Sequence, residues 1–312
     1  MEAVMIDSFS DTPKLATLDK PTPAPGEILL RMVAASLNPI DWRIATGFLD
    51  GKKPHHFPLI LGAEGSGIVE AVGEGVTKFL VGDAVIGNFL HHQIGHGSFA
   101  EYQVIQEDAM LLRVNNLIDL VQASALPIAA MTAWQAVNTL NLPSGSRVLL
   151  VGASGGVGTF TVQFAAQFGY KVIAVAATEA TTLLHKLGAC NVIDRHKSSV
   201  NTQVLLRYTN GIDGIIDLVN PPDAFAQLLP LLKPQGTAIS TIGSASLKMS
   251  QHIRLVNLEM KPELSDLRLL MEKLANNTLQ VVVDRTIGLE QVPAALEQIR
   301  QGGIRGKILI RY

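Results

Sequence analysis

Four glycines between residues 152 and 158 have the spacing of a phosphate-binding turn. The segment Gly152 to Gly158 reads GASGGVG, follows an apolar run at 148–151 and precedes an apolar stretch that extends to about residue 168. Such glycines permit a sharp strand-to-helix turn and a close approach of the backbone to a pyrophosphate. The helix that follows offers free N–H groups to phosphate oxygens. A second apolar run at 171–176 completes a strand–turn–helix–strand unit that is typical of dinucleotide binding.

The residues of this turn that we expect to contact the cofactor phosphates are Ser154, Gly155, Gly156 and Val157. Because Ala153 replaces the first glycine of the G-x-G-x-x-G pattern, the flanking strand and helix supply much of the support for this interpretation. The same letters also spell G-x-S-x-G, the nucleophile elbow of serine hydrolases, with Ser154 followed in order by Asp217 and His252. A glycine turn without a ligand is a further alternative.

The end of the second predicted strand bears on the choice of nicotinamide nucleotide. An acid there would bind the ribose hydroxyls of NADH and repel a 2′-phosphate, but this chain has Ala176, Ala177 and Thr178. Thr178 could hydrogen-bond a phosphate, and Arg195 could pair with it. Glu179 is a displaced acid that would act in the opposite direction. The sequence therefore favours NADPH over NADH.

Composition excludes several functional classes. The chain has 312 residues, 47% hydrophobic and 17% charged, which is typical of a well-packed globular protein of two domains. With a formal net charge of −2 and a pI near 6.4, we expect neither nucleic acid nor a membrane as partner. The single cysteine, Cys190, excludes an internal disulfide, and no signal-peptide pattern is present, so we expect a reducing, cytoplasmic setting.

The elements that must position these residues change character along the chain. Up to about residue 117, short apolar runs separated by glycines predict strands of a small β-barrel-like domain, among them 27–34, 65–72 and 82–87. Residues 121–140 read as a helix interrupted at Pro127. Strands at 148–151, 171–176, 191–194, 214–219 and 236–242 then alternate with helices, which predicts an α/β fold with a doubly wound parallel sheet of Rossmann type.

An ordered set of short motifs resembles the medium-chain dehydrogenase/reductase superfamily, and within it the zinc-independent, NADPH:quinone reductase-like branch. The resemblance covers nearly the whole chain. The motifs are ASLNPID at 35–41, PLILGAEGSGIV at 58–69, VGDAV at 81–85, GSFAEY at 97–102, ALP at 125–127, MTAW at 131–134, the glycine turn, and GKI at 306–308.

This resemblance implies two alcohol dehydrogenase-like domains and, in many members, a homodimer. Residues 1–117 and 259–312 would form a GroES-like β-barrel domain, and 118–258 the dinucleotide-binding Rossmann domain. Zinc-using relatives carry cysteine at Asn38, histidine at Ala63 and a second cysteine near Pro127. Since none of the three residues here can bind zinc as thiolate or imidazole, we expect no metal.

The resemblance also implies the remaining site residues. Asn38 would lie near the nicotinamide as a catalytic and cofactor-binding residue, because its amide can both donate and accept. Further cofactor contacts would come from strand ends and the helix at 131: Thr132, Asn220, Ile242, Gly243 and Ser244. The substrate side would include Arg43, Phe48, His91 and His92.

Together these observations predict a cytoplasmic, zinc-independent oxidoreductase. Without a metal, hydride transfer from NADPH suits an electron-poor acceptor, such as a quinone or an enone. An enoyl-thioester reductase and a non-catalytic NADPH-binding sensor or structural protein are the alternatives. Turnover with a simple quinone discriminates the enzyme from the non-catalytic protein.

Overall fold

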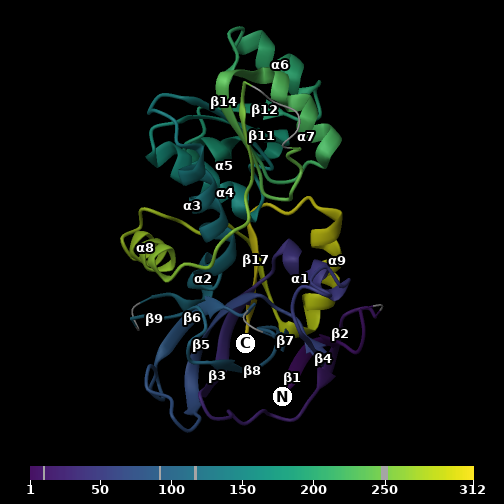
Figure 1. The fold of residues 1–312 in the computed structure, drawn as a ribbon, viewed down its shortest axis with the longest axis vertical. Helices are drawn as coiled ribbons and strands as arrows, with labels where there is room; N and C mark the ends of the chain where they lie inside the picture. The colour runs from purple at the N-terminus through teal and green to yellow at the C-terminus, as the bar shows by residue number, and fades with distance from the viewer. Residues whose placement is uncertain (10, 91–92, 116–117, 247–251) are drawn as a thin grey trace. The chain divides into compact units, whose positions relative to one another are not determined.

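The computed structural model describes residues 1–9, 11–90, 93–115, 118–246 and 252–312. The chain divides into two compact units (Figure 1). The first combines Met1–Ala129 with Pro262–Tyr312, and the second is Ala130–Lys261. The domain boundaries predicted from the sequence follow residues 117 and 258, whereas the compact units change after Ala129 and Lys261. Within the described ranges, no helix is both long and apolar enough to cross a membrane.

Two mainly antiparallel sheets form most of the first unit. The larger has the strand order β16-β17-β3-β5-β6-β9, with β8 beside β3, and the smaller has the order β2-β1-β4-β7. The strands are β1 (Glu2–Ile6), β2 (Lys14–Thr17), β3 (Glu27–Ser36), β4 (His55–Ile60), β5 (Glu64–Val72), β6 (Ala84–Asn88), β7 (Ile94–His96), β8 (Tyr102–Gln106), β9 (Leu111–Arg113), β16 (Val283–Ile287) and β17 (Lys307–Arg311).

Strand β3, near the N-terminus of the chain, pairs with the C-terminal strand β17. It pairs with β5 and β8, and the C-terminal strand β17 adds to it with Leu309 opposite Ser36. Ile28, Leu30 and Met32 of β3 are buried in one hydrophobic cluster, while Ala35 lies in another with Ile308 of β17. This pairing brings the start of β17 beside the end of β3.

The helices of the first unit are α1 (Pro39–Ala45), α2 (Leu120–Ala123), α8 (Leu264–Ala275) and α9 (Val292–Gln301), with the 3₁₀ turn η4 (Leu289–Gln291). Helix α1 starts directly after β3 because Pro39 occupies the first helical turn, where a missing N–H costs nothing. The Asp41 carboxylate accepts the N–H of Asn38, which satisfies a backbone donor at the helix start.

The second unit is built on a six-stranded, all-parallel sheet with the order β12-β11-β10-β13-β14-β15. This arrangement confirms the predicted doubly wound Rossmann sheet. The strands are β10 (Arg147–Val151), β11 (Lys171–Ala176), β12 (Asn191–Asp194), β13 (Ile212–Asp217), β14 (Leu232–Ser240) and β15 (Arg254–Asn257). Strand order reverses between β10 and β13, and ligands of open α/β sheets bind outside the carboxyl ends of strands at such a switch point.

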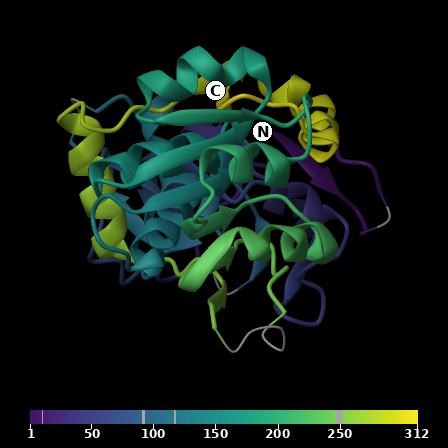
Figure 2. The same ribbon diagram turned by 90° about the horizontal axis from the view of Figure 1, so that it is seen from above.

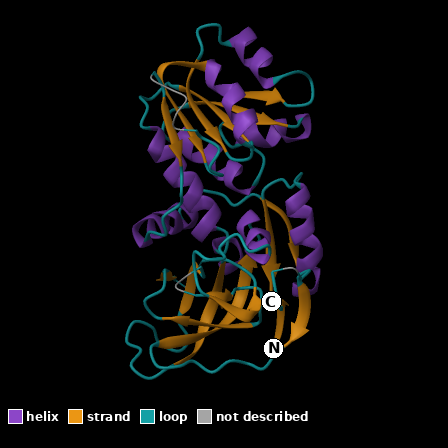
Figure 3. Ribbon diagram, turned by 45° about the vertical axis from the view of Figure 1, so that its right-hand side comes forward, coloured by secondary structure: helices purple, strands orange, loops and turns teal. Residues whose placement is uncertain are grey.

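Helices cover both sides of this parallel sheet, as Figure 2 shows. On one face, Leu149 and Val151 of β10 pack in a cluster with Val204 of α6 (Val200–Arg207) and Phe225 of α7 (Pro222–Leu228). In Figure 3, which colours helices and strands differently, the second unit shows both kinds of element, whereas strands predominate in the first unit. The helices are α3 (Met131–Leu140), α4 (Gly156–Gln167), α5 (Thr181–Lys186), α6 (Val200–Arg207) and α7 (Pro222–Leu228), with 3₁₀ turns η2 (Thr178–Ala180) and η3 (Leu229–Leu231).

The predicted interruption at Pro127 is larger than expected. The structure has α2, then a π-helical segment η1 (Leu126–Ala130), and only then α3. Since proline cannot donate to a preceding carbonyl, a regular helix cannot run through this position undisturbed. The strand predicted at 214–219 is also displaced: β13 ends at Asp217, so Asn220 lies in the loop that follows.

Candidate active site

The glycine turn of the second unit has the geometry that a phosphate-binding turn requires. Gly152 has φ +83°, a left-handed conformation that favours glycine. A Cβ on Gly158 would lie 2.1 Å from the Gly152 carbonyl oxygen, whereas the nearest atom to a Cβ on Gly155 would be 3.5 Å away. Gly155 caps α4, and its carbonyl accepts the N–H of Thr159 at 2.9 Å. The first N–H groups of α4, which include those of Gly156 and Val157, therefore have no carbonyl of the preceding turn to bond.

Next to this turn, the loop after β13 is held by a buried carboxylate. Asp217 accepts the backbone N–H groups of Val219 and Asn220 at 3.0 and 2.9 Å, and the Asn220 Nδ2 at 2.8 Å. Burial raises the pKa of Asp217, and these hydrogen bonds oppose the rise. Because both of its oxygens accept hydrogen bonds from its own loop, Asp217 stabilises the conformation of the loop after β13. This role disfavours the serine hydrolase interpretation, in which Asp217 would orient His252.

The loop after β14 is tied to the same edge. The buried Ser240 hydroxyl accepts the N–H groups of Ile242 and Ser244 at 3.3 and 3.0 Å. The Ser244 hydroxyl in turn donates to the Asn220 carbonyl at 2.6 Å. Gly243, between them, has φ +82° and open space where a Cβ would be. Three predicted cofactor residues, Asn220, Gly243 and Ser244, thus lie together at the carboxyl edge of the sheet.

At the neighbouring strand ends, the structure adds a carboxylate that the sequence analysis did not consider. Asp194, the last residue of β12, is the parallel partner of Ala176 and accepts a hydrogen bond from the Thr178 hydroxyl. Its other oxygen accepts the His196 N–H at 2.9 Å. The bond from Thr178 is the largest cause of the lowered pKa of Asp194. Arg195 donates through Nε to the His196 ring at 3.2 Å.

Two further cofactor predictions occupy ordinary helix and turn positions. Thr132 is the second residue of α3, and Ser154 is partly buried in the turn before α4. Their contacts with a cofactor stay predictions, as do those of Val157 and Ile242.

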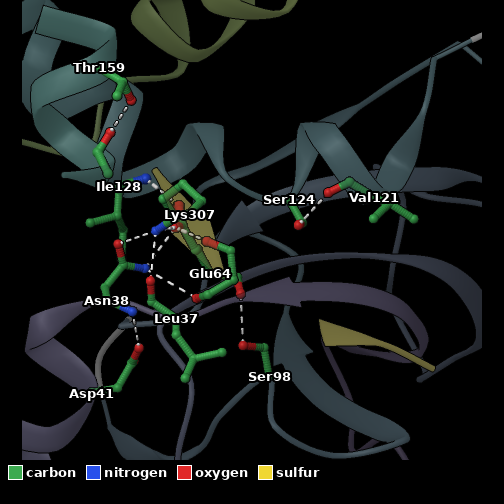
Figure 4. Close-up of polar contacts among 12 residues, drawn as sticks. Leu37, Asn38, Asp41, Glu64, Ser98, Val121, Ser124, Ile128, Thr159 and Lys307 are labelled. Atoms are coloured by element: carbon green, nitrogen blue, oxygen red, sulfur yellow. Dashed lines mark hydrogen bonds and ion pairs between the residues drawn. The ribbon is translucent and has the colours of Figure 1, made fainter. Parts of the chain in front are cut away.

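In the first unit, the predicted residue Asn38 lies in a buried polar cluster (Figure 4). Its Nδ2 donates to the Glu64 carboxylate at 2.7 Å and to the Ser36 carbonyl at 3.2 Å. Its Oδ1 accepts a hydrogen bond from the Lys307 ammonium at 2.6 Å. Only 3% of Asn38 is exposed. Both amide hydrogens are therefore used inside the protein, so this amide can offer a ligand only its remaining acceptor capacity.

Glu64 and Lys307 are the charged members of this cluster. One Glu64 oxygen accepts the Ser36 hydroxyl at 2.5 Å and the Lys307 ammonium at 3.1 Å, and the other accepts the Ile128 N–H at 2.6 Å. Both side chains are almost fully buried, at 0% and 2% exposed. The sequence predictions did not include Glu64; the available signal was a single acid inside the otherwise uncharged stretch 57–69.

Asp41, one turn into α1, is the third buried charge near Asn38. Burial raises its pKa to about 7, opposed by the Asn38 N–H bond and by Lys307, while Glu64 acts in the same direction as burial. Its Oδ1 has no hydrogen-bond partner among the described residues. A carboxyl group with this pKa exchanges its proton near neutral pH.

The predicted substrate residues separate into two groups. Arg43 lies with its guanidinium carbon 5.3 Å from the Phe48 ring centre, and Phe48 is 45% exposed. The Lys52 ammonium lies 4.3 Å from the centre of the same Phe48 ring. His91 and His92 lie outside the described residues. Contact of any of these four with substrate stays a prediction.

No group of three or more histidine, cysteine, aspartate or glutamate side chains in the described ranges is arranged to hold a metal. The rings of His56 and His96 stack with their centres 5.1 Å apart. Burial, and then the neighbouring His56, lower the pKa of His96.

Comparisons with known proteins place the chain in a family. Residues 24–116 match the alcohol dehydrogenase GroES-like domain, and residues 187–310 match the zinc-binding dehydrogenase family. The chain is 32% identical over 326 residues to the chloroplastic quinone-oxidoreductase homolog of Spinacia oleracea, covering 99% of this chain and 98% of the relative. It is 31% identical over 331 residues to the mitochondrial NAD(P)H oxidoreductase RTN4IP1 of Bos taurus, covering 92% and 82%.

A solved structure agrees with these sequence relatives. The quinone oxidoreductase of Coxiella burnetii superposes with a TM-score of 0.88 at 28% identity, covering 100% of this chain and 99% of that one. The chain therefore belongs to the medium-chain dehydrogenase/reductase superfamily, in its quinone oxidoreductase-like branch.

Proposed function

We propose that this protein is an NADPH-dependent, zinc-independent reductase that delivers hydride to quinones and other conjugated carbonyl acceptors. The observation that carries the proposal is the glycine turn at the carboxyl edge of the parallel sheet. There the backbone at Gly155 is open, while Gly158 has no room for a side chain. The bound nucleotide would supply the hydride, and the protein its orientation.

The chain's own groups fit a dinucleotide at this edge. The N–H groups of Gly156 and Val157 would hold the pyrophosphate at the positive end of α4. The loop that carries Asn220 is preformed by Asp217, so binding does not have to order it. This preformed edge favours a nucleotide ligand over an unliganded turn.

The donor set of the first unit does not fit zinc. The Ala63 side chain has no atom that can bind a metal. The Asn38 and Glu64 oxygens already accept hydrogen bonds from the Lys307 ammonium. A divalent cation there would meet a buried positive charge instead of the thiolates and imidazoles it requires. We therefore propose that hydride transfer proceeds without a metal. Metal content after purification, and activity in the presence of a chelator, test this part of the proposal.

For the nucleotide, we favour NADPH over NADH. Arg195 uses its Nε on His196, and a guanidinium has four further N–H groups that suit a phosphate dianion. The ionised Asp194 beside Thr178 opposes this preference, because a carboxylate repels a 2′-phosphate. The preference thus depends on Arg195 outweighing Asp194.

The test is a titration with NADPH and NADH followed by an acceptor screen. We expect tighter binding of NADPH and rapid NADPH oxidation with a simple quinone or enone, but not with a saturated aldehyde. Enoyl thioesters in the same screen test the alternative acceptor class. Tight nucleotide binding with no turnover on any acceptor would contradict the enzyme and indicate a non-catalytic NADPH-binding protein.

We further propose a homodimer that works in a reducing, cytoplasmic compartment, as the family resemblance and the single Cys190 suggest. Light scattering during size-exclusion chromatography tests the dimer. A monomer at micromolar concentration would contradict it.

A further inference from the structure

The cluster of Asn38, Glu64 and Lys307 leaves little freedom in its hydrogen bonding. The Lys307 ammonium has three hydrogens and three oxygen partners: the Leu37 carbonyl at 2.8 Å, Asn38 Oδ1 at 2.6 Å and Glu64 at 3.1 Å. The two hydrogens of Asn38 Nδ2 go to Glu64 and to the Ser36 carbonyl. Each donor in this cluster is therefore matched to an acceptor within the protein.

These partners fix which way the Asn38 amide points. An ammonium can only donate, so the amide must turn its oxygen toward Lys307. An ionised carboxylate can only accept, so the amide must turn its nitrogen toward Glu64. A flipped amide would place Nδ2 against the ammonium and Oδ1 against the carboxylate, two repulsive contacts in a buried, low-dielectric place. Figure 4 shows the three side chains converging in this way.

The backbone holds Lys307 in place for this contact. Gly306 has φ +86°, and a Cβ on it would lie 2.3 Å from the Val282 carbonyl oxygen. Lys307 then begins β17, which is paired with β3 on one side and β16 on the other. The ammonium is thus set on the cluster by a paired strand.

We propose that Lys307 is the positioning residue for Asn38, and that it makes Asn38 an acceptor only. The inference rests on the proposed function and on the family resemblance, which implies that Asn38 lies near the nicotinamide. In that setting Lys307 contacts neither nucleotide nor substrate, because its three hydrogens are used. Instead it holds the Asn38 oxygen in one direction and compensates Glu64. Asn38 would then accept a hydrogen bond from the ligand but would not donate the proton that the reduction requires.

The experiment compares the full-length wild type with Lys307→Met, and with Arg311→Met as the matched control. Arg311 is an exposed cation on the same strand. The first readout is the side-chain amide of Asn38 in ¹⁵N–¹H spectra, assigned by its loss in Asn38→Asp. The second is the steady-state kinetics of NADPH oxidation with a quinone, taken as kcat and KM separately and across pH.

In the wild type and in Arg311→Met, we expect one pair of Asn38 amide resonances protected from exchange with water. In Lys307→Met the pair should shift and lose protection, and kcat should fall about tenfold or more while the KM for quinone changes little. Unchanged Asn38 resonances together with unchanged kcat would overturn the proposal.

If Lys307→Met does not fold, the double variant Glu64→Gln/Lys307→Met replaces it, since that pair leaves no single buried charge uncompensated. The Asn38 resonances are again expected to lose protection, and intact protection would overturn the proposal. The two readouts also keep the two claims apart. A wild type that reduces no acceptor refutes the proposed function, while its Asn38 resonances still decide the role of Lys307.

Discussion

The two units use polar groups in opposite ways. In the first, Asn38, Glu64 and Lys307 bond each other, and each is 3% exposed or less. In the second, side chains such as Asp217 and Ser240 bond the loops of the sheet edge, while the start of α4 keeps backbone N–H groups available. A cluster that satisfies itself gives rigidity, and an edge with unused donors gives a binding site. We infer that the first unit holds the Asn38 side chain in position, while the second unit offers the binding site for a nucleotide.

The largest effect is expected where this binding edge is tightest. Gly158→Ala would put a methyl group 2.1 Å from the Gly152 carbonyl oxygen. The turn must then distort, which we expect to cost about 1–3 kcal/mol of stability and about 100-fold or more in nucleotide affinity. Thermal unfolding and calorimetric titration measure both. For stability alone, Gly155→Ala is the control, because its Cβ has room and φ is −77°; its nucleotide affinity should also fall, since Gly155 is expected to contact the phosphates. A Gly158→Ala protein with wild-type affinity would refute the proposed cradle.

The self-satisfied cluster can be broken by removing its anion. Glu64→Gln would leave the buried Lys307 ammonium without its carboxylate, so we expect a loss of about 3–5 kcal/mol in the free energy of unfolding. Denaturant unfolding measures this loss. Glu70→Gln on the same strand is the matched control; its carboxylate is partly exposed and pairs with Lys20, so we expect a loss below about 1 kcal/mol. Equal losses in both variants would show that the buried Glu64–Lys307 pair contributes no more to stability than the partly exposed Glu70 pair.

The pH dependence of stability sharpens the same contrast. Since the folded-state pKa of Asp41 is raised from 3.8 to about 7, the folded protein holds this proton more tightly than the unfolded chain. This stabilisation is complete below about pH 4 and is lost as pH rises through about 7. The wild type should therefore lose about 2 kcal/mol relative to Asp41→Asn between about pH 5 and pH 8. Denaturant unfolding at the two pH values measures the difference, and parallel pH profiles would contradict it.

The smallest effect concerns the edge of the nucleotide site. Arg195→Ala should weaken NADPH binding about tenfold and leave NADH binding nearly unchanged, because only NADPH carries the 2′-phosphate. Calorimetric titration of both nucleotides measures this ratio. Equal losses for both would place Arg195 outside the phosphate site. Lys186→Ala, in the last turn of α5, is the charge-matched control.

The contrast between the units also separates what the sequence could predict from what it could not. The glycine turn and the parallel strands are local patterns, because strand, turn and helix follow one another within about thirty residues. The Glu64–Lys307 pair joins residues 243 positions apart, and only the addition of β17 to β3 brings them together. Asp194 was missed for a similar reason, since its place beside Ala176 comes from the register of two parallel strands. The hydrogen bonds that occupy the Asn38 amide come in part from Glu64 and Lys307, which are distant from it in the sequence.

The central claim is that a nicotinamide nucleotide binds where β10 meets α4, and Gly156→Asp tests it most directly. A carboxylate in the first turn of α4 interacts favourably with the helix dipole, so the variant should fold with wild-type or slightly higher stability. The same carboxylate would repel a pyrophosphate. Calorimetric titration with NADPH should then show at least about a 100-fold loss of affinity in a well-folded protein. Equal affinity in the two proteins would place the nucleotide elsewhere and contradict the account.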